Sequence, residues 1–433
     1  MKRSPPTLEL PPPPQLRPGA RIWLAYSGGG DSSALLHRLH ALGMPGLRAV
    51  HVHHGLQASA DAWASHCRAF CRQLGIPLKQ LRVSVAGDHP AGPEAAAREA
   101  RYAALRELMR PGDCLVTAHH RDDQAETLLL RLLRGTGVAG AAAMRPVAEF
   151  APGLLWRPLL EIPQERLRAY ALAQGLEWVE DPHNSDPRYS RSWLRTELMP
   201  GLRQRWPQAG ESLARFARHA GEVAGLLEAL ADLDLAATQQ GVALSVSGLL
   251  ALPVARRHNL LRRWLALQAG ETPPADWLSR CDRELLGARP DAGPCLPLGA
   301  HELRRYRDRL YLMRALSSPP GGLELAWRRG RVLALPADCG RLVAGRAPAM
   351  PLVVRWPRGG ERLRAAPGVP SRSLKNLFQE LGIPVWVRER TPLVWGEGRL
   401  LAVGGYWQER EFARSGLQIR WESALPGAFA DKH

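Results

Sequence analysis

The chain is poor in cysteine, and its few cysteines are not spaced as metal or redox motifs. Six cysteines are spread over 433 residues, and none forms a CxxC pair. This argues against zinc ribbons, iron–sulfur clusters, dithiol chemistry and a disulfide scaffold. Cys67 and Cys71 are four positions apart in a helical pattern and are predicted to be core residues. We therefore expect a protein of the reducing cytoplasm.

Long apolar runs are also missing. No stretch approaches the roughly 18 apolar residues that span a bilayer. The N-terminal sequence MKRSPPTLELPPPPQLRPG is broken by prolines and lacks the apolar region of a signal peptide. We expect neither a membrane anchor nor a signal peptide.

Acidic residues are outnumbered by basic ones. The chain has 41 Asp and Glu against 58 Lys and Arg, which gives a formal charge of +17. This balance indicates a polyanionic partner, either nucleic acid or an anionic membrane surface, and the lack of apolar runs weakens the membrane alternative. Hydrophobic residues (45%) and charged residues (23%) are present in ordinary globular proportions, which excludes wholesale disorder.

The first half of the chain alternates between strand and helix patterns. After a proline-rich lead-in over 1–17, which we expect to be extended and poorly ordered, short apolar runs predict strands near 22–26, 49–52, 81–85 and 114–118. Helical spacing of apolar residues lies between them. Such alternation predicts an α/β domain over 18–205, a doubly wound parallel sheet with helices on both faces.

The composition changes after residue 205. Apolar residues at helical spacing predict a mainly helical middle domain over 206–315, with a short strand pair near 302–313. A Ser-Ser-Pro-Pro-Gly-Gly stretch at 317–322 is typical of a linker. The short apolar runs of 323–433, broken by Gly and Pro, predict a small α+β domain.

The strongest local motif is SGGGDS at 27–32, between the first predicted strand and a helix. Three glycines let the backbone approach a ligand closely, and their amides in front of a helix N-terminus form an anion-binding nest. No lysine follows as in a Walker A loop, so a γ-phosphate transferase is disfavoured. Asp31 in a phosphate site suggests a bridging Mg²⁺. The alternative is a glycine-rich turn with Asp31 as a helix cap.

Three further segments carry polar residues that could belong to a site. HVHHGL at 51–56 falls where the second strand should end, at the edge where α/β sheets bind ligands. Glu94, Arg98 and Arg101 share one helix face, which a solvated salt-bridged surface would also explain. AHHRDDQAET at 118–127 is more acidic than helix capping requires, and favours a polar pocket for an ammonium group over a zinc site.

The hexapeptide resembles the PP-loop of the N-type ATP pyrophosphatases, which cleave ATP between the α and β phosphates. With HVHHGL, PEAAAREARY and AHHRDDQAETLLLRLLRGTGVAGAAAM, it resembles the tRNA(Ile)-lysidine synthetase family. The resemblance continues over 157–160, 180–184, 189–200, 256–265, 375–378 and 384–388. Two positions depart from the family pattern, Ser192 in place of Asn and His183 in place of Ser.

The resemblance implies an ATP-dependent enzyme that modifies the wobble cytidine of an isoleucine tRNA with a CAU anticodon. ATP adenylates the 2-carbonyl oxygen and pyrophosphate leaves. The ε-amine of free L-lysine then displaces AMP, and the resulting lysidine pairs with A instead of G. No obligate protein partner is inferred.

The family's functional positions fall on matching residues of this chain. The resemblance assigns ATP binding to Ser27, Gly28, Gly29, Gly30, Asp31 and Ser32. It assigns catalysis to Asp31, Arg98 and His120, and Asp31 would also bind Mg²⁺ through ATP. It assigns lysine binding to Asp123 and Glu126. Arg98 would hold phosphates or the substrate carbonyl, and His120 would accept the proton of the attacking amine. Candidate tRNA contacts, which could equally be solvated charges, are Arg191, Arg195, Arg262, Arg263, Arg358, Arg362 and Lys375.

Three rival functions share some of these features. A PP-loop tRNA thiolase needs reactive cysteines, and Cys67, Cys71 and Cys114 lack the paired arrangement. A non-catalytic RNA-binding protein would not be expected to keep Asp31 and the whole acidic segment. An amidotransferase-type synthetase would need a glutaminase domain, for which the sequence gives no sign.

Overall fold

The computed structural model describes residues 7–53, 60–84, 93–180, 188–289, 292–328, 330–363, 370–414 and 417–428. The chain forms two compact units, Met1–Leu226 and Leu227–His433, which divide within one long helix. Each unit is described by itself. The division of the sequence into three domains at 205, 315 and 323 stays a prediction.

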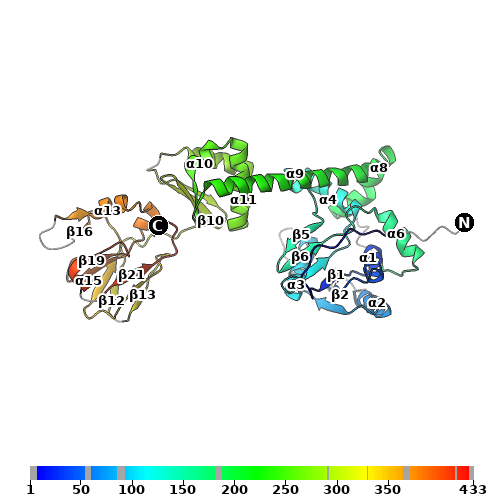
Figure 1. The fold of residues 1–433 in the computed structure, drawn as a ribbon, viewed down its shortest axis with the longest axis horizontal. Helices are drawn as coiled ribbons and strands as arrows, with labels where there is room; N and C mark the ends of the chain where they lie inside the picture. The colour runs from blue at the N-terminus through cyan, green and yellow to red at the C-terminus, as the bar shows by residue number, and fades with distance from the viewer. Residues whose placement is uncertain are drawn as a thin grey trace. The chain divides into compact units, whose positions relative to one another are not determined.

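The first unit alternates strands and helices along the chain (Figure 1). Its elements are β1 (Ile22–Ala25), α1 (Gly30–Ala41), β2 (Leu47–His53), α2 (Ala60–Gln73), β3 (Leu78–Arg82), α3 (Pro93–Leu108), β4 (Cys114–Val116), α4 (Arg121–Leu133), α5 (Val138–Ala141), β5 (Val147–Phe150), β6 (Gly153–Trp156), α6 (Gln164–Ala173), α7 (Ser190–Trp193), the π-helical turn η2 (Leu194–Leu198), α8 (Met199–Arg205) and the first part of α9 (Ala209–Thr238).

These strands form one six-stranded sheet in the order β3-β2-β1-β4-β6-β5. All neighbouring pairs are parallel except β5 with β6. The chain moves outward from β1 to β3 and then returns to place β4 on the other side of β1. The carboxyl ends of β1 and β4 therefore form a topological switch point, where α/β sheets bind ligands.

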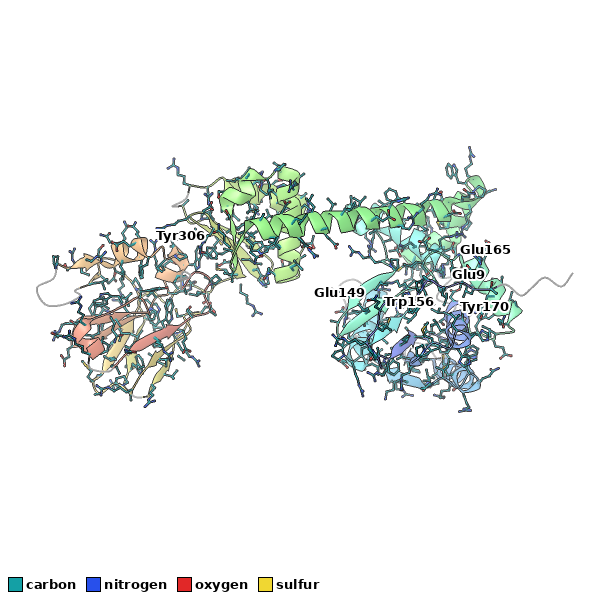
Figure 2. All side chains as sticks on the ribbon, viewed as in Figure 1. Glu9, Glu149, Trp156, Glu165, Tyr170 and Tyr306 are labelled. Carbon is teal, nitrogen blue, oxygen red and sulfur yellow. The ribbon has the colours of Figure 1, made fainter. Side chains whose placement is uncertain are left out.

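Side chains of β1 point alternately to the two faces of the sheet. Leu24 packs in a cluster with apolar residues of α1, α2 and α6, and Trp23 packs in a second cluster with Leu105 of α3. Trp156 and Tyr170 belong to the first cluster and lie in the interior of this unit (Figure 2). Helices thus cover both faces, which confirms the predicted doubly wound sheet.

Two features differ from the prediction. β3 ends at Arg82, before Val83, and Val85 lies outside the described residues. The described part of the lead-in, 7–17, forms no helix or strand, but it is not free of the fold: Leu8 is buried in the sheet core, and its carbonyl accepts a hydrogen bond from Arg38 Nε at 2.6 Å. Leu8 and Leu10 lie between prolines in a stretch too short to show periodicity, so burial here was not predictable from pattern.

The long helix α9 packs through small residues. Ala217 and Ala220 contact Leu128 and Ala141 in one cluster. Phe216, on the face that the sequence pattern places in the core, is 53% exposed. The small alanine side chains let α9 approach α4 and α5 closely. Bulky residues of α9 that neighbour these alanines, such as Phe216, remain exposed to solvent.

The second unit contains two groups of elements. The first comprises β7 (Gln239–Gln240), β8 (Ala243–Ser245), α10 (Val246–Ala251), α11 (Val254–Ala269), α12 (Ala275–Arg280), η3 (Cys281–Leu286), β9 (Cys295–Leu298), β10 (His301–Tyr306) and β11 (Arg309–Arg314). The second comprises β12 (Glu324–Trp327), β13 (Val332–Ala334), β14 (Arg341–Ala344), β15 (Leu352–Arg355), β16 (Arg362–Leu363), β17 (Arg372–Ser373), α13 (Leu374–Glu380), α14 (Val385–Arg388), β18 (Leu393–Gly396), β19 (Arg399–Val403), β20 (Trp407–Gln408), α15 (Arg410–Arg414) and β21 (Ile419–Glu422).

The helices of the first group pack on an antiparallel sheet, β7-β8-β11-β10-β9, and this confirms the strand pair predicted near 302–313. The other three strands are too short to show alternation in the sequence. The second group has sheets of five, three and two strands. With α13 to α15 they form the predicted α+β fold, around a core that includes Trp386 and Trp421.

Candidate active site

The SGGGDS loop joins β1 to α1 and is shaped by its first two glycines. Gly28 has a φ of +87°, and a Cβ at this position would lie 3.0 Å from Cys67 Sγ. Gly29 is the N-cap of α1 and brings no side-chain acceptor to the first-turn amides. Those amides lie at the carboxyl edge of the sheet, and no capping side chain accepts their hydrogen bonds. They are therefore available to an anion.

Two serines and a neighbouring segment fix the loop. Ser27 Oγ accepts a hydrogen bond from the amide of Gly29 at 3.2 Å and lies 3.0 Å from Ser32 Oγ. The carbonyl of Gly28 accepts a hydrogen bond from the amide of Val179 at 3.0 Å. The Trp178 ring would lie 3.5 Å from a Cβ on Gly30. The loop is therefore held in shape before any ligand binds.

A cavity of about 560 Å³ opens next to this loop. It falls within the roughly 300–1,000 Å³ typical of ligand sites. Its lining combines the loop with the carboxyl end of β4, with residues of α3 and α6, and with Arg195. Of the residues predicted from the sequence, Ser27, Gly29, Gly30, Asp31, Ser32, His120, Asp123 and Arg195 line it.

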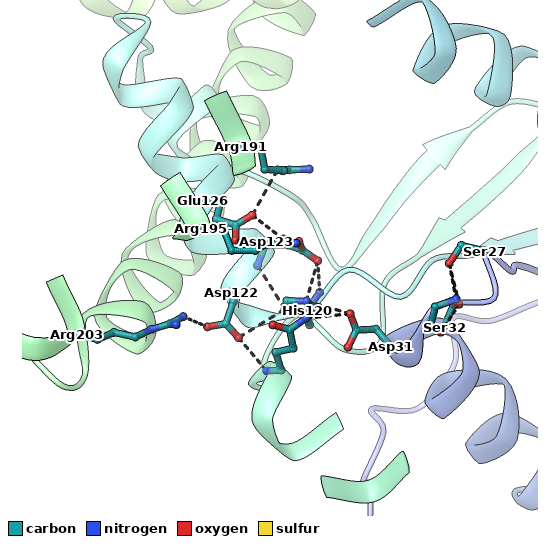
Figure 3. Close-up of polar contacts among 12 residues, drawn as sticks. Ser27, Asp31, Ser32, His120, Asp122, Asp123, Glu126, Arg191, Arg195 and Arg203 are labelled. Carbon is teal, nitrogen blue, oxygen red and sulfur yellow. Dashed lines mark hydrogen bonds and ion pairs between the residues drawn. The ribbon is translucent and has the colours of Figure 1, made fainter. Parts of the chain in front are cut away.

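His120, the N-cap of α4, is enclosed by carboxylates (Figure 3). Its Nε2 lies 3.5 Å from Asp31 Oδ2 and 3.4 Å from Asp123 Oδ2, and its Nδ1 lies 3.6 Å from Asp122 Oδ2. Burial alone would lower the pKa of His120, but the three carboxylates raise it to about 10. The side chain is therefore a cation at neutral pH. The proton-accepting role needs a state in which these carboxylates are engaged elsewhere, and it stays a prediction.

His119 has the opposite environment, although it is the same residue type one position earlier. Burial, together with nearby arginines that include Arg98 and Arg157, lowers its pKa to about 3 against the opposing effect of Asp123. Its Nδ1 lies 2.8 Å from Thr117 Oγ1, and the residue lines the cavity. The neutral imidazole of the pair is thus His119, which the sequence could not distinguish from its neighbour.

The two predicted lysine-binding carboxylates contact two predicted tRNA-binding arginines. Arg195 Nε lies 2.8 Å from Glu126 Oε1, and its NH2 lies 2.9 Å from Glu126 Oε2 and 3.0 Å from Asp123 Oδ1. Arg191 Nε lies 3.5 Å from Glu126 Oε2. Burial raises the pKa of Glu126, which the arginines oppose, whereas the neighbouring cations lower the pKa of Asp123 in spite of its burial.

Asp122, Gln164 and Arg203 support this cluster and were missed as site residues. Asp122 Oδ2 accepts a hydrogen bond from the backbone amide of Gln164 at 2.8 Å, and Asp122 Oδ1 pairs with Arg203. The side chain of Gln164 donates to Asp31 Oδ2 at 3.3 Å. Gln164 thus links the PP-loop carboxylate to the α4 N-terminus. Of these three residues, only Asp122 lies in a segment that the sequence singled out, AHHRDDQAET.

The arginines of α3 are placed differently from one another. Arg101 and Tyr102 line the cavity, whereas Arg98 is exposed and is not part of the lining. The Arg98 guanidinium lies 4.9 Å from the centroid of the Tyr102 ring. Its catalytic role stays a prediction. His54 and His183 lie outside the described residues, and so does the side chain of Glu94.

The other candidate tRNA contacts lie in the second unit. Arg263 forms two hydrogen bonds to Asp232, at 2.8 and 3.0 Å, and Arg262 is half-buried beside it on α11. Arg358 donates to the carbonyl of Gly322, and Arg362 donates to Ser371. Lys375 is exposed on α13. The exposed charges of Arg358, Arg362 and Lys375 are accessible to a polyanion.

The thiols of the first unit are buried, and the described residues contain no cluster of metal ligands. Burial raises the pKa of Cys67, Cys71 and Cys114 to about 12 each, so these thiols are not nucleophiles at neutral pH. Where the chain is described, no cluster of three or more His, Cys, Asp or Glu could hold a metal ion by itself. In the same residues no helix combines the length and apolarity needed to cross a membrane.

Comparison with known proteins agrees with this geometry. Residues 9–202 match the family described as PP-loop domain, residues 244–311 the TilS substrate binding domain, and residues 352–422 the TilS substrate C-terminal domain. The chain is 43% identical over 426 residues to a tRNA(Ile)-lysidine synthase of Xanthomonas campestris pv. campestris (strain 8004), covering 94% of this chain and 97% of the relative. It is 42% identical over 430 residues to that of Escherichia coli O157:H7, covering 94% and 98%.

Among solved structures, the chain is similar to the U34-tRNA thiolase NcsA from Methanococcus maripaludis, described with its [4Fe-4S] cluster. The TM-score is 0.40 at 19% identity, over 48% of this chain and 73% of that one.

Proposed function

Since the chain belongs to the tRNA(Ile)-lysidine synthase family, we propose that it joins free L-lysine to carbon 2 of the wobble cytidine in the CAU anticodon of an isoleucine tRNA. On this proposal the product carries a new carbon–nitrogen bond, and AMP and pyrophosphate are released. The modified base pairs with A, so the anticodon reads AUA instead of AUG. The observation that carries this proposal is the match to these enzymes over 94% of the chain, with the PP-loop and the acidic α4 N-terminus on one cavity.

In the first step, the 2-carbonyl oxygen of cytosine attacks the α phosphorus of ATP, and the bond to the β phosphate breaks. The amides of the PP-loop and the α1 N-terminus stabilise the leaving pyrophosphate. Asp31 is a carboxylate one-third exposed at the loop. It suits Mg²⁺ held mainly by substrate phosphates, which would add positive charge there. Arg98 is proposed to offset charge on the phosphates or the carbonyl.

In the second step, the neutral ε-amine of lysine attacks carbon 2, and the bond from that carbon to the adenylate oxygen breaks. Asp123 and Glu126 are proposed to hold the lysine ammonium groups in the buried first turns of α4. The amine must lose a proton, and His120 is the proposed acceptor. Since three carboxylates keep His120 protonated in the free enzyme, this role requires their engagement by substrates.

The basic surface is proposed to bind tRNA through phosphate contacts. Arg191 and Arg195 lie in the first unit, and Arg262, Arg263, Arg358, Arg362 and Lys375 in the second. We propose that the predicted domains 206–315 and 323–433 serve tRNA binding. The target base must leave the anticodon stack, at a cost of a few kcal/mol. We further propose that the enzyme works in the cytoplasm without an obligate protein partner.

A single assay tests this function. Purified protein is incubated with ATP, Mg²⁺, labelled lysine and an unmodified transcript of isoleucine tRNA with a CAU anticodon. A methionine tRNA transcript, which shares the anticodon, serves as control. We expect label in the isoleucine transcript only, with one AMP formed per lysine incorporated. Incorporation without ATP, or equal incorporation into both transcripts, would contradict the proposal.

A further inference from the structure

All four carboxylate oxygens of the proposed lysine subsite are occupied within the protein (Figure 3). Arg195 engages both oxygens of Glu126, at 2.8 and 2.9 Å, and Oδ1 of Asp123 at 3.0 Å. The remaining oxygen, Oδ2 of Asp123, accepts the backbone amide of His120 at 3.1 Å. An incoming ammonium group therefore finds its position taken by the Arg195 guanidinium.

The charge of the cluster is balanced as well. The carboxylates of Asp31, Asp122, Asp123 and Glu126 are matched by the cations His120, Arg191, Arg195 and Arg203. A further cation would gain no net attraction here while Arg195 stays in place. Glu126 is 2% exposed. If Arg195 moved away, Glu126 would be a buried carboxylate that had lost its closest cation. Such a charge strongly favours a replacement cation.

Arg195 is placed to leave. Its side chain is 32% exposed and lines the same cavity as the PP-loop. It lies in η2, a π-helical turn, and such turns often occur at functional sites. Guanidinium groups pair with phosphate oxygens in the same two-pronged geometry that they use with carboxylates. A phosphate group entering the cavity would therefore compete for Arg195.

We propose that Arg195 is an exchangeable counter-ion of the lysine subsite. In the free enzyme it neutralises Asp123 and Glu126. When a phosphate-bearing substrate enters, Arg195 pairs with the phosphate and leaves both carboxylates to lysine. The phosphate is supplied by ATP or by the tRNA backbone, and in either case lysine binds after it. The inference rests on the proposed function, because it takes Asp123 and Glu126 as the lysine subsite.

Equilibrium binding of labelled lysine tests the exchange. Wild type and Arg195→Gln are each titrated alone, with a non-hydrolysable ATP analogue, with the isoleucine tRNA transcript, and with both. Mildly alkaline pH keeps Glu126 ionised, since burial raises its pKa and the charged groups facing it are Arg191, Arg195 and Asp123. We expect wild type to bind lysine about tenfold more tightly when the substrate that supplies the phosphate is present. Whether the ATP analogue or the tRNA has this effect identifies the source of the phosphate. Without any other substrate, Arg195→Gln should bind lysine about tenfold more tightly than wild type does. Adding the ATP analogue or the tRNA should then increase its lysine affinity little.

Two controls separate exchange from damage to the fold. Arg218→Gln removes an exposed arginine of α9 that pairs with Glu222, outside the charge cluster of the lysine subsite, and it should leave lysine affinity at the wild-type value. In Arg195→Ala, added methylguanidine should refill the position and compete with lysine. Thermal unfolding and binding of the ATP analogue confirm that each variant is folded.

Other outcomes overturn the inference. Wild type that binds lysine equally in all four arms, or a folded Arg195→Gln that alone binds lysine no more tightly than wild type, contradicts counter-ion exchange. In either case lysine incorporation by wild type would leave the proposed function standing. If Glu126→Gln binds lysine as wild type does in every arm, the subsite itself is wrong, and the inference fails with it.

Discussion

Helices α1 and α4 follow the adjacent parallel strands β1 and β4, yet their first turns are prepared for opposite charges. α1 begins at Gly29 with no side-chain cap, and its amides are left to an anion. α4 begins at His120, whose backbone amide donates to Asp123 Oδ2, and Asp122 and Asp123 lie in its first turn. The sheet thus places both helix ends at one edge. On the proposed function, nucleotide phosphate and lysine ammonium would meet there because the two ends differ.

The largest effect is expected from Gly28→Ala. The φ of +87° strains any other residue, and the new Cβ would contact Cys67 Sγ at 3.0 Å. Displaced loop amides should lower kcat/KM for pyrophosphate release roughly 100- to 1,000-fold. Gly43→Ala is the matched control, since it has a φ of +63° but nothing within 4 Å of the added Cβ. Pyrophosphate release by Gly43→Ala should stay at the wild-type rate, and equal losses in both variants would assign the effect to backbone strain alone.

A smaller and selective effect is expected from Glu126→Gln at the other helix end. Loss of one buried carboxylate charge should raise the KM for lysine roughly 10- to 100-fold, because a charged hydrogen bond contributes about 1.5–3 kcal/mol. The KM for ATP should not rise, which steady-state kinetics measures directly. Glu149→Gln, an exposed carboxylate on β5, serves as control. A common rise in both KM values would mean that the two helix ends do not act as separate sites.

His120→Asn tests the charge of the α4 cap, because asparagine also caps helices but cannot be protonated. The folded pKa of His120 is about 10, above its usual 6.5, so its stabilising charge is fully present below pH 6.5 and is lost as the pH rises through 10. Wild type should exceed the variant in free energy of unfolding by about 5 kcal/mol below pH 6.5. Between pH 6.5 and 10 the difference should shrink by about 1.4 kcal/mol per pH unit. Urea unfolding across this pH range measures it, and a constant difference would show that His120 is neutral in the folded protein.

The smallest effect is expected from a single surface charge. Lys375→Gln should weaken tRNA binding only a few-fold and reduce the slope of log affinity against log salt by about one. Arg263→Gln should change the slope less, because Asp232 already holds that guanidinium at 2.8 and 3.0 Å. Filter binding at several salt concentrations separates the two. Identical slopes for both variants and wild type would remove these residues from the tRNA surface.

The sequence was informative where one residue type serves one purpose. The run of glycines in 27–32 predicted the anion loop, because only glycine tolerates the φ of Gly28 and the contact with Cys67. Strand and helix alternation predicted the sheet, although the two-strand edge β5–β6 escaped it, since this antiparallel pair has no helix between its strands.

The sequence was silent where long-range packing decides. Nothing in a pair of adjacent histidines shows that carboxylates surround His120 while arginines lie near His119. Gln164 was missed because its role depends on α6 beginning next to Asp31 and Asp122. Arg195 and Glu126 were predicted for different ligands, and their ion pair became visible only when η2 was placed beside α4.

The most direct measurement of the two-site account uses ATP labelled at the α phosphorus, with isoleucine tRNA present and lysine omitted. The account predicts that pyrophosphate is released and that the label becomes attached to the tRNA, to be freed as AMP only when lysine is added. Label appearing in ADP, or AMP released at full rate without lysine, would contradict it.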